Sequence, residues 1–330
     1  MPLFEAKRNK IPSNLLTDRF LIPPFSIFDT KMGYWQDRKR NWINLGIQSE
    51  LGRGDNLTYN LAHFNYDEEK EAKEKSKFGK CMPEFGDAYG RKAQATSIFD
   101  PVLCEIAYKW FSVDGAKVLD PFAGGSVRGL IAGMTGRTYY GIDLSEKQIA
   151  ANELQYNEIS SKYDGIVKPT WINGDSMNVK ELVNQDGFDL VFSCPPYYDL
   201  EVYSDKEEDL SNKDTYQEFL DGYFEIIKRS CALLKDNSFA IFVVGNMRDK
   251  NGMYYDFVGD TVRAFQAAGL GYYNEAIVIN VAGSLPVRAP KQFNAGRKLG
   301  KQHQQFLVFY KGDPSKIKDR FGSFEGDDND

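Results

Sequence analysis

Histidine and cysteine are scarce in this chain of 330 residues, and their scarcity excludes several kinds of site. The only two histidines are His63 and His303, so we expect no histidine-rich metal centre and no metal cofactor. No two cysteines stand in a CxxC pair, which argues against a disulfide framework and a structural zinc site. The four cysteines lie at positions 81, 104, 194 and 231. This usage suits a reducing cytoplasm.

Long apolar runs are also lacking. The N-terminus, MPLFEAKRNK, carries no apolar signal stretch, and no run approaches membrane-spanning length. We therefore expect a soluble, cytoplasmic protein without a membrane partner. The formal net charge of −6 gives no sign of a nucleic-acid binder by itself, so the distribution of charge along the chain has to be inspected.

The chain divides by texture into three parts. Residues 1–95 are irregular and rich in aromatic and basic residues, and we predict an N-terminal extension there, a candidate DNA-contacting region. They include a charged stretch, 67–80, that is typical of an exposed helix or a linker. Residues 96–313 form the predicted catalytic domain, and residues 314–330 are predicted to be a disordered acidic tail.

Apolar strands alternate with amphipathic helices throughout the central part. The predicted strands are 116–122, 138–145, 188–198 (running into a loop), 238–246, 275–281 and 304–312. The predicted helices are 126–136, 145–160 with Ser145 as its N-cap, 215–234 and 256–270. This alternation indicates an α/β fold, a mostly parallel sheet with helices on both faces. In such sheets, ligands bind beyond the carboxyl ends of the strands.

A glycine-containing loop, DPFAGGS at 120–126, follows the first predicted strand and opens a helix. Glycines let the backbone pass close to a ligand. The spacing fits neither the GxGxxG of a dinucleotide site nor the GK[ST] of a phosphate-binding P-loop. A nucleoside with an amino-acid tail suits the loop better, with the loop carbonyls and Asp120 facing an ammonium group.

Acidic residues follow the next two strands. Asp143 ends the second strand about 20 residues further on, where a carboxylate can bind the two hydroxyls of a ribose. The third strand ends at Asn173-Gly174-Asp175, where a carboxylate can accept a hydrogen bond from an adenine amino group. Each acid alone is common as a helix cap or a turn residue, but three in succession at strand ends favour a nucleoside site.

The fourth strand ends in Ser193-Cys194-Pro195-Pro196-Tyr197. Two consecutive prolines fix the backbone and remove two N–H donors, so the carbonyls form a rigid acceptor array. Such an array can hold an amino group, and Tyr197 offers an aromatic face on which a base can stack. A proline-stiffened loop that merely ends a strand is the simpler alternative.

The DPFAGGS loop followed by a P-P-Y element resembles the amino-directed DNA methyltransferases, whose signature is a [DNS]-P-P-[YF] tetrad with a D-P-F-x-G cofactor loop. The upstream segment 97–111, SIFDPVLCEIAYKWF, looks like the segment that contacts the methionine end of the cofactor in that family. This motif order is the one termed gamma. Residues 23–47, 194–205 and 283–313 look like stretches of phage-encoded members, which would place the protein in a host cytoplasm.

The resemblance implies a class I S-adenosylmethionine-dependent methyltransferase with a Rossmann-like fold, which acts on DNA. The base would be flipped out of the stack and methylated directly on its amino nitrogen. The predicted catalytic residues are Ser193, Cys194, Pro195, Pro196 and Tyr197. The residues predicted to bind S-adenosylmethionine are Phe99, Asp100, Asp120, Pro121, Phe122, Ala123, Gly124, Gly125, Ser126, Asp143, Leu144, Asp175 and Ser176.

One residue departs from the family pattern, because Cys194 stands where the family has Asp, Asn or Ser. A thiol is a weak hydrogen-bond acceptor, so Ser193 or main-chain carbonyls would hold the amino proton. Cysteine is nearest in size to serine, which at this position resembles N4-cytosine enzymes. We therefore expect N4 of cytosine before N6 of adenine. A nucleophilic thiol, as in ring-carbon methylation, is an alternative.

Basic residues cluster in two places that we predict to contact DNA. The first cluster, between Trp35 and Trp42, mixes aromatic and basic groups and consists of Arg38, Lys39 and Arg40. The second lies within 276–312, which contain no acidic residue, and its glycines predict a mobile loop over 283–303. The predicted DNA contacts there are Arg288, Lys291, Arg297, Lys298 and Lys301.

The sequence is also compatible with other hypotheses about the methyl acceptor and the function. The acidic insertion 199–214 would repel phosphate, so we expect it to turn outward or to cover the cofactor. An RNA or a protein glutamine could be the methyl acceptor, since related P-P-Y tetrads serve there too. A third hypothesis is a non-catalytic DNA-binding protein with a nucleoside-binding fold. The sequence is compatible with a homodimer and with a restriction-modification or phage anti-restriction setting, but it does not reveal a partner nuclease.

Overall fold

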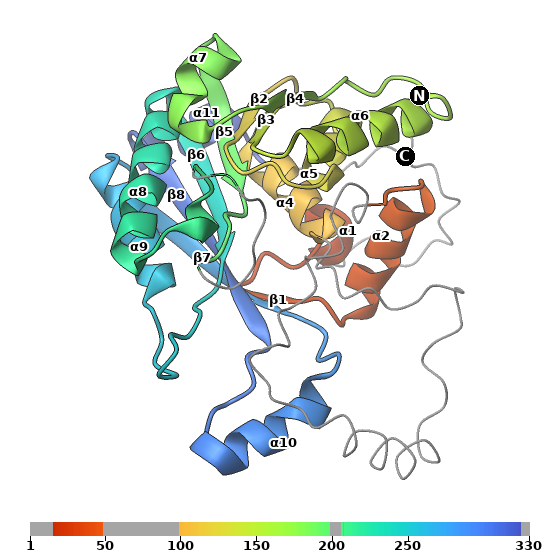
Figure 1. Ribbon diagram of the computed structural model, residues 1–330. Coiled ribbons are helices and arrows are strands. Elements are labelled where there is room, and N and C mark those ends of the chain that lie inside the picture. The colour runs from red at the N-terminus through yellow and green to blue at the C-terminus, as the bar shows by residue number, and fades with distance from the viewer. Residues whose placement is uncertain (1–15, 49–98, 199–205, 207, 325–330) are drawn as a thin grey trace.

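The computed structural model describes residues 16–48, 99–198, 206 and 208–324 of the chain (Figure 1). The charged stretch 67–80 lies outside these residues.

Eight strands form one sheet in the order β1-β7-β8-β6-β5-β2-β3-β4. The strands are β1 (Ile27–Asp29), β2 (Lys117–Asp120), β3 (Thr138–Asp143), β4 (Thr170–Asn173), β5 (Phe188–Ser193), β6 (Leu234–Val244), β7 (Gly271–Ile279) and β8 (His303–Lys311). β8 runs antiparallel to both of its neighbours, whereas the other neighbouring strands pair in parallel. The predicted mostly parallel sheet is confirmed.

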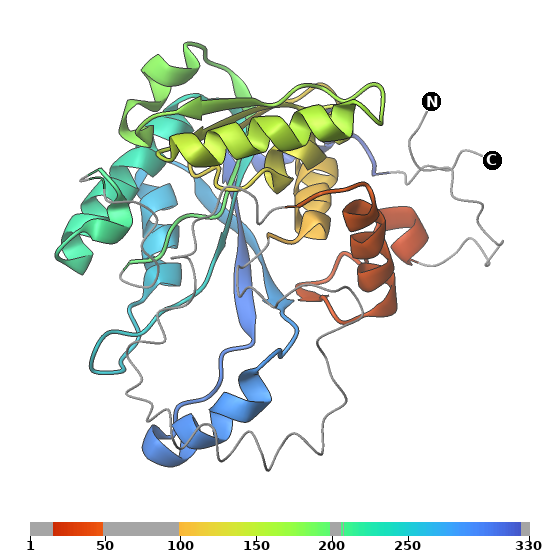
Figure 2. The same ribbon diagram turned by 45° about the vertical axis from the view of Figure 1, so that its right-hand side comes forward.

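Helices cover both faces of the sheet (Figures 1 and 2). One layer comprises α4 (Pro101–Phe111), α5 (Val127–Met134) and α6 (Glu146–Ser160), and the other α7 (Val179–Val183), α8 (Tyr216–Ala232) and α9 (Phe257–Ala267). The predicted N-cap of α6 is confirmed, because the Ser145 hydroxyl accepts a hydrogen bond from the backbone N–H of Gln148. Within the described residues, no helix is long and apolar enough to cross a bilayer.

Successive residues of the central strands enter two different cores. Val118 and Phe192 pack in the core under α4 and α5, whereas Leu119 and Val191 pack in the core under α8 and α9. β5 is buried at all of its positions, because a parallel strand covered on both faces needs apolar side chains on both sides. The sheet therefore holds its carboxyl edge rigidly between two layers.

Residues 16–48 belong to this fold. They contain α1 (Leu16–Phe20), β1, which extends the sheet by pairing with β7, and α2 (Gly33–Asn44), which packs against α4. Trp35 and Trp42 stand seven residues apart and both are buried. The prediction of irregular structure is therefore wrong for this part of the extension, because α2 buries an aromatic face.

The chain after β8 is also folded through residue 324. η5 (Pro314–Lys316) leads into α11 (Ile317–Phe321), where the Arg320 guanidinium lies 2.8 Å from the Asp189 carboxylate and Phe321 packs against Phe239. The predicted disordered tail is wrong for this segment, because an aromatic contact and an ion pair fix it to the sheet. Residues 325–330 lie outside the described part.

The segment between β7 and β8 contains a helix, α10 (Leu285–Gly296), which Figures 1 and 2 show standing away from the sheet. We call residues 280–302 the arm. The predicted loop over 283–303 is wrong for the helical residues. Pro286 lies in the first turn, where proline fits a helix, and Arg297 ends the helix in a left-handed conformation with φ +52°. No residue of α10 is buried.

Candidate active site

Three loops meet at the carboxyl edge of the sheet. Parallel pairing sets Asp120 of β2 beside Gly141 of β3, and Asp143 of β3 beside Asn173 of β4. The predicted cofactor residues after these strands are therefore brought together. Backbone and side-chain bonds tie them: the N–H of Gly174 donates to the carbonyl of Asp143 at 3.0 Å.

The Asp120 carboxylate is the centre of a buried network. It is fully buried and accepts hydrogen bonds from the Phe122 N–H at 3.1 Å and the Ser193 hydroxyl at 2.5 Å. It also accepts from Arg128 Nε at 2.6 Å and from the Tyr139 hydroxyl at 2.7 Å. The expected partner, an ammonium group of a cofactor, is thus replaced by the chain's own guanidinium. Asp120 therefore holds the residues of the site in place from the protein interior.

Arg128 belongs to this network and was not predicted from the sequence. Its Nη2 donates to the carbonyls of Phe122 at 2.5 Å and Ala123 at 2.8 Å, and its guanidinium lies 4.8 Å from the ring centre of Phe99. Burial is the largest single influence on the pKa of Arg128 and lowers it. The charge and hydrogen bond of Asp120, together with Tyr139 and Cys194, outweigh burial and raise that pKa above its ordinary value. Arg128 stays charged and fixes the bend of the DPFAGGS loop.

Gly124 connects the DPFAGGS loop to Asp143. Its φ of +52° lies in the left-handed region that favours glycine. Its N–H donates to Asp143 Oδ2 at 2.9 Å, and its carbonyl accepts from the Asn152 amide at 2.8 Å. Asp143 accepts a second bond from the Ser145 N–H at 2.8 Å, which leaves carboxylate lone pairs for a ligand.

Asp143 is half-buried. Burial raises the pKa of Asp143, and the hydrogen bonds from Ser145 and Gly124 oppose that rise. A hydroxyl donor from a ligand would likewise favour the charged carboxylate. The position suits an acceptor for ribose hydroxyls.

The remaining predicted cofactor residues surround this point. Asp175 caps η3 (Ser176–Asn178) by accepting from the Met177 N–H, and the Ser176 hydroxyl donates to the Pro121 carbonyl at 2.5 Å. The carbonyl of Leu144 accepts from Lys206 at 2.7 Å, which brings a described residue of the acidic insertion against the site.

Three further predicted residues have partners inside the protein. Ser126 is buried, and its hydroxyl donates to the side-chain oxygen of Gln155. Asp100 caps α4 by accepting from the Val102 N–H at 3.0 Å. Phe99 packs edge-on against Phe192 at 5.8 Å, beside the strand that leads to the tetrad.

The predicted catalytic loop leaves β5 next to this network. Ser193 is fully buried and its hydroxyl donates to Asp120, so its side chain faces the interior. Cys194 and Pro196 are half-buried, and Pro195 is buried. The backbone carbonyls and Cys194 are then the groups of the tetrad suited to meet an amino group. The Tyr197 ring lies 5.8 Å from that of Phe257 in an edge-to-face contact.

An aromatic cluster supports the loop after the tetrad. Tyr198 contacts the rings of Tyr216, Phe219 and Tyr255, and Tyr216 stacks on Tyr255 at 4.1 Å. The partners of Tyr198 come from α8 and from the β6–α9 connection, so two distant segments support the loop after the tetrad. The spacing of aromatic residues in the sequence gives no sign of this assembly.

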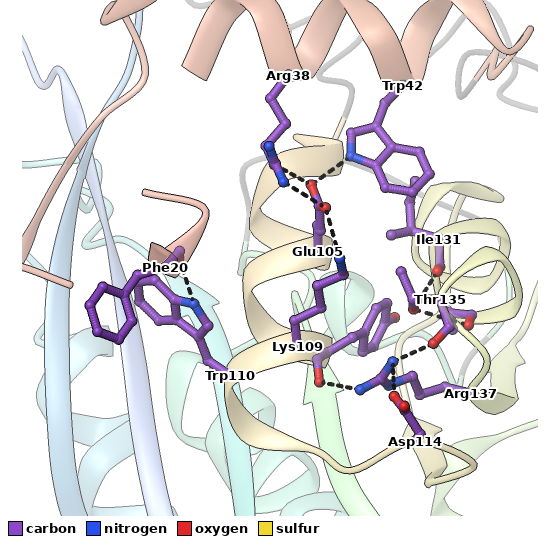
Figure 3. A network of polar contacts seen from close by, with 12 residues as sticks. Phe20, Arg38, Trp42, Glu105, Lys109, Trp110, Asp114, Ile131, Thr135 and Arg137 are labelled. Atoms are coloured by element: carbon purple, nitrogen blue, oxygen red, sulfur yellow. Dashed lines mark hydrogen bonds and ion pairs between the residues drawn. The ribbon is translucent and has the colours of Figure 1, made fainter. Parts of the chain in front are cut away.

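The first predicted DNA-binding cluster lies against α4 (Figure 3). Arg38 forms an ion pair with the buried carboxylate of Glu105 at 2.7 Å, and the Trp42 indole donates to the same carboxylate at 2.8 Å. Lys39 pairs with Asp100 at 3.0 Å. Both cations fasten α2 to α4 through these ion pairs, and their predicted contact with DNA stays a prediction. Arg40 is exposed.

The second cluster remains at the surface. Arg288, Lys291, Arg297 and Lys298 of the arm are exposed, whereas Lys301 is half-buried. The arm extends from the carboxyl edge of the sheet, the edge that holds the tetrad, because β7 is parallel to β5 and leads into the arm.

No protein-family model matches the sequence, and no curated protein matches it significantly. TrmN from Thermus thermophilus aligns over 64% of this chain and 49% of its own, at 15% identity and a TM-score of 0.42. A methyltransferase from Pyrococcus furiosus aligns over 75% of this chain and 100% of its own, at 13% identity and a TM-score of 0.43. A candidate DNA modification methylase, also from Thermus thermophilus, aligns over 42% and 52%, at 18% identity and a TM-score of 0.32. The chain thus spans about half the length of the two Thermus proteins.

The fold class follows from the sheet itself. The strand order, with β8 reversed between β6 and β7, is that of the class I methyltransferase fold, so the predicted fold class is confirmed. Among the described residues, no group of three or more His, Cys, Asp or Glu side chains is placed to hold a metal ion.

Proposed function

We propose that this protein transfers a methyl group from S-adenosylmethionine to the exocyclic amino group of a flipped base in DNA. One observation carries the proposal: the Asp120 carboxylate joins the two motif loops directly. It binds Ser193 at the head of the tetrad and Arg128 under the DPFAGGS loop. A methyl donor on one loop and an amino group on the other would share the same edge of the sheet.

The donor chemistry of the cofactor side fits S-adenosylmethionine. Asp143 would accept the ribose hydroxyls, the loop of Asp175 and Ser176 would lie beside the adenine, and the DPFAGGS loop with Phe99 and Asp100 would face the methionine end. A pyrophosphate fits poorly, because carboxylates line this edge where phosphate needs N–H donors and cations. When bound, the cofactor supplies an electrophilic methyl group on a sulfonium.

The tetrad would position the acceptor. The carbonyls of Cys194 and Pro195 accept hydrogen bonds from the amino N–H groups and turn the nitrogen lone pair toward the methyl carbon. The nitrogen would form a bond to the methyl carbon as the C–S bond of the donor breaks, and the extra proton would leave from nitrogen to water. The same carbonyl dipoles stabilise the positive charge that develops on nitrogen, while Tyr197 stacks on the base. Since the thiol can stand in for the small serine, N4 of cytosine is the favoured target.

Nucleoside mass spectrometry tests the proposal. Purified protein is incubated with S-adenosylmethionine in three separate reactions, which contain unmethylated genomic DNA, RNA or total protein. We expect a methylated amino base in DNA alone. Tyr197→Ala should lower turnover by at least about a hundredfold while cofactor affinity persists, because stacking and alignment are lost. Asp143→Ala should show the reverse, weakened cofactor binding.

Each rival hypothesis has its own outcome in this experiment. Methyl groups on RNA or on glutamine, with none on DNA, would replace DNA as the substrate. Failure to bind S-adenosylmethionine in equilibrium dialysis would leave a non-catalytic DNA-binding protein. A retained rate in Tyr197→Ala would make the tetrad a structural loop.

A further inference from the structure

Lys301 differs from the other cations of the arm. It lies where the arm returns to the sheet, two residues before β8, and it is half-buried. Its Nζ donates to the backbone carbonyl of Asn246 at 2.6 Å, just after the end of β6. This bond places the ammonium at the carboxyl edge of the sheet. A lysine that contacts a DNA phosphate would instead point its ammonium into solvent.

The end of β6 leaves room for this ammonium beside the tetrad. A Cβ built on Gly245 would lie 2.8 Å from Lys301 Nζ and 3.6 Å from the Tyr197 hydroxyl. Lys301 and Tyr197 therefore flank the same point from the arm and from the catalytic loop. A larger residue at 245 would push one of them away, so glycine permits the approach.

Lys301 has no counter-ion among the described residues. None of the carboxylates that the structure describes lies within ion-pair distance of it, and Asn246 takes only one of its three N–H donors. Burial lowers the pKa of Lys301 to about 8, and the Arg248 guanidinium adds to that effect. The other two N–H donors of this half-buried ammonium can therefore bind water or a ligand.

We propose that Lys301 is a specificity-determining residue of the target pocket, whose ammonium donates a hydrogen bond to the ring carbonyl of the flipped base. The inference rests on the proposed function and names its substrate class: an amino-pyrimidine, cytosine. A base stacked on Tyr197 presents its polar edge to the groups around the ring. Cytosine carries a carbonyl oxygen on that edge, whereas adenine carries an amino group and ring nitrogens and has no carbonyl.

The contact acts on binding more than on the chemical step. A hydrogen bond to the carbonyl draws electron density away from the amino nitrogen and gives no help to its attack. Loss of the contact should therefore raise KM for DNA and leave kcat nearly unchanged. Removal of a charged hydrogen bond weakens kcat/KM by about tenfold to a hundredfold.

The test uses the full-length protein and a short duplex that carries the site mapped by modified-base sequencing. Lys301→Met should raise KM for this duplex by about tenfold or more, and Lys301→Arg should restore most of the loss, because guanidinium also donates. Lys298→Met, which removes an exposed lysine of the same segment, is the matched control. It should leave unchanged the ratio of KM between the cytosine duplex and a second duplex whose target base lacks the carbonyl. A duplex whose target is a 2-aminopyridine nucleoside keeps the amino group and lacks the carbonyl. On it, wild type and Lys301→Met should have the same KM.

A pH profile gives a second readout. Since the pKa lies near 8, wild type should lose affinity for the cytosine duplex as the pH rises through about 8, and Lys301→Arg should not. The groups that face Lys301 are Arg248 and the Tyr197 hydroxyl. The guanidinium does not titrate in this range, so its charge stays constant.

The possible outcomes distinguish the role of Lys301 from the proposed methyltransferase activity on which it rests. If Lys301→Met loses equally on both duplexes, or loses nothing on cytosine, the inference is overturned while the methyltransferase stands. N6-methyladenine as the wild-type product would overturn it in the same way. An absence of any methyl group in DNA would overturn the proposed function itself.

Discussion

The two basic clusters of this chain look alike in sequence, but in the structure one is paired with buried acids and the other is exposed. Arg38 and Lys39 lie between two tryptophans and are held by the carboxylates of Glu105 and Asp100. The cations of α10 stand on a helix with no buried residue, in a stretch, 276–312, that contains no acidic residue. A basic run is therefore informative only together with the acids that the fold brings to it.

Burial explains the difference between the clusters. Glu105 on α4 is 4% exposed, and a buried carboxylate requires cationic and N–H partners, which α2 supplies through Arg38 and Trp42. The cations of α10 stay at the surface, where phosphate can reach them. The first cluster stabilises the fold, and the second is the candidate DNA surface.

The largest test of this contrast neutralises the arm. Replacement of Arg288, Lys291, Arg297 and Lys298 by alanine should lower the slope of log affinity against log salt by about 3.6. At moderate salt we expect DNA binding about a hundredfold weaker, with an unchanged melting temperature, because these side chains are exposed. Fluorescence anisotropy with labelled duplex across a salt series measures both quantities.

A matched variant removes four exposed lysines outside the arm: Lys162, Lys168, Lys228 and Lys318. This control should leave the salt slope near that of wild type. Equal slopes in the two variants would show that affinity follows total charge, and the contrast between the clusters would be lost.

The second test breaks the internal cluster. Arg38→Ala leaves the buried Glu105 carboxylate with the Trp42 indole and a Lys109 ammonium at 3.8 Å. We expect the free energy of unfolding to fall by about 2 kcal/mol, somewhat below a fully buried pair because the arginine is 31% exposed. Urea denaturation gives the loss in stability, and anisotropy on the folded protein should show an unchanged salt slope. A slope lower by about one would instead return Arg38 to the DNA surface.

Sequence reasoning reached those features that depend on local pattern. Apolar runs predicted β2, β3, β5, β6, β7 and β8, whereas the three-residue β1 was missed. The position of Asp143 and of DPFAGGS at strand ends predicted which loops meet, because parallel strands bring their carboxyl ends to one edge. The N-cap at Ser145 could also be predicted, because it depends on the local sequence at the start of the helix.

The rest depended on contacts between distant residues. In the sequence, Arg128 is a single charged residue on an apolar helix. Only the packed loop shows that it occupies the place expected for a ligand ammonium. α10 was not predicted, because the glycines at positions 283, 296 and 300 in and around it are typical of a loop. The spacing of Trp35 and Trp42, two helical turns apart, was the available signal that α2 has a buried face.

The smallest test concerns Arg40, the member of the N-terminal cluster left at the surface. Its guanidinium pairs with the exposed Asp37 one turn earlier, so the local charge is balanced and an exposed pair contributes below about 0.5 kcal/mol. Arg40→Ala should therefore change neither the urea midpoint nor the salt slope of DNA binding. Asp37→Ala is its counterpart: it leaves the cation unbalanced, and DNA affinity should stay constant if this face is remote from the duplex. A gain in affinity in Asp37→Ala, with a loss in Arg40→Ala, would show that the DNA footprint extends from the arm to α2.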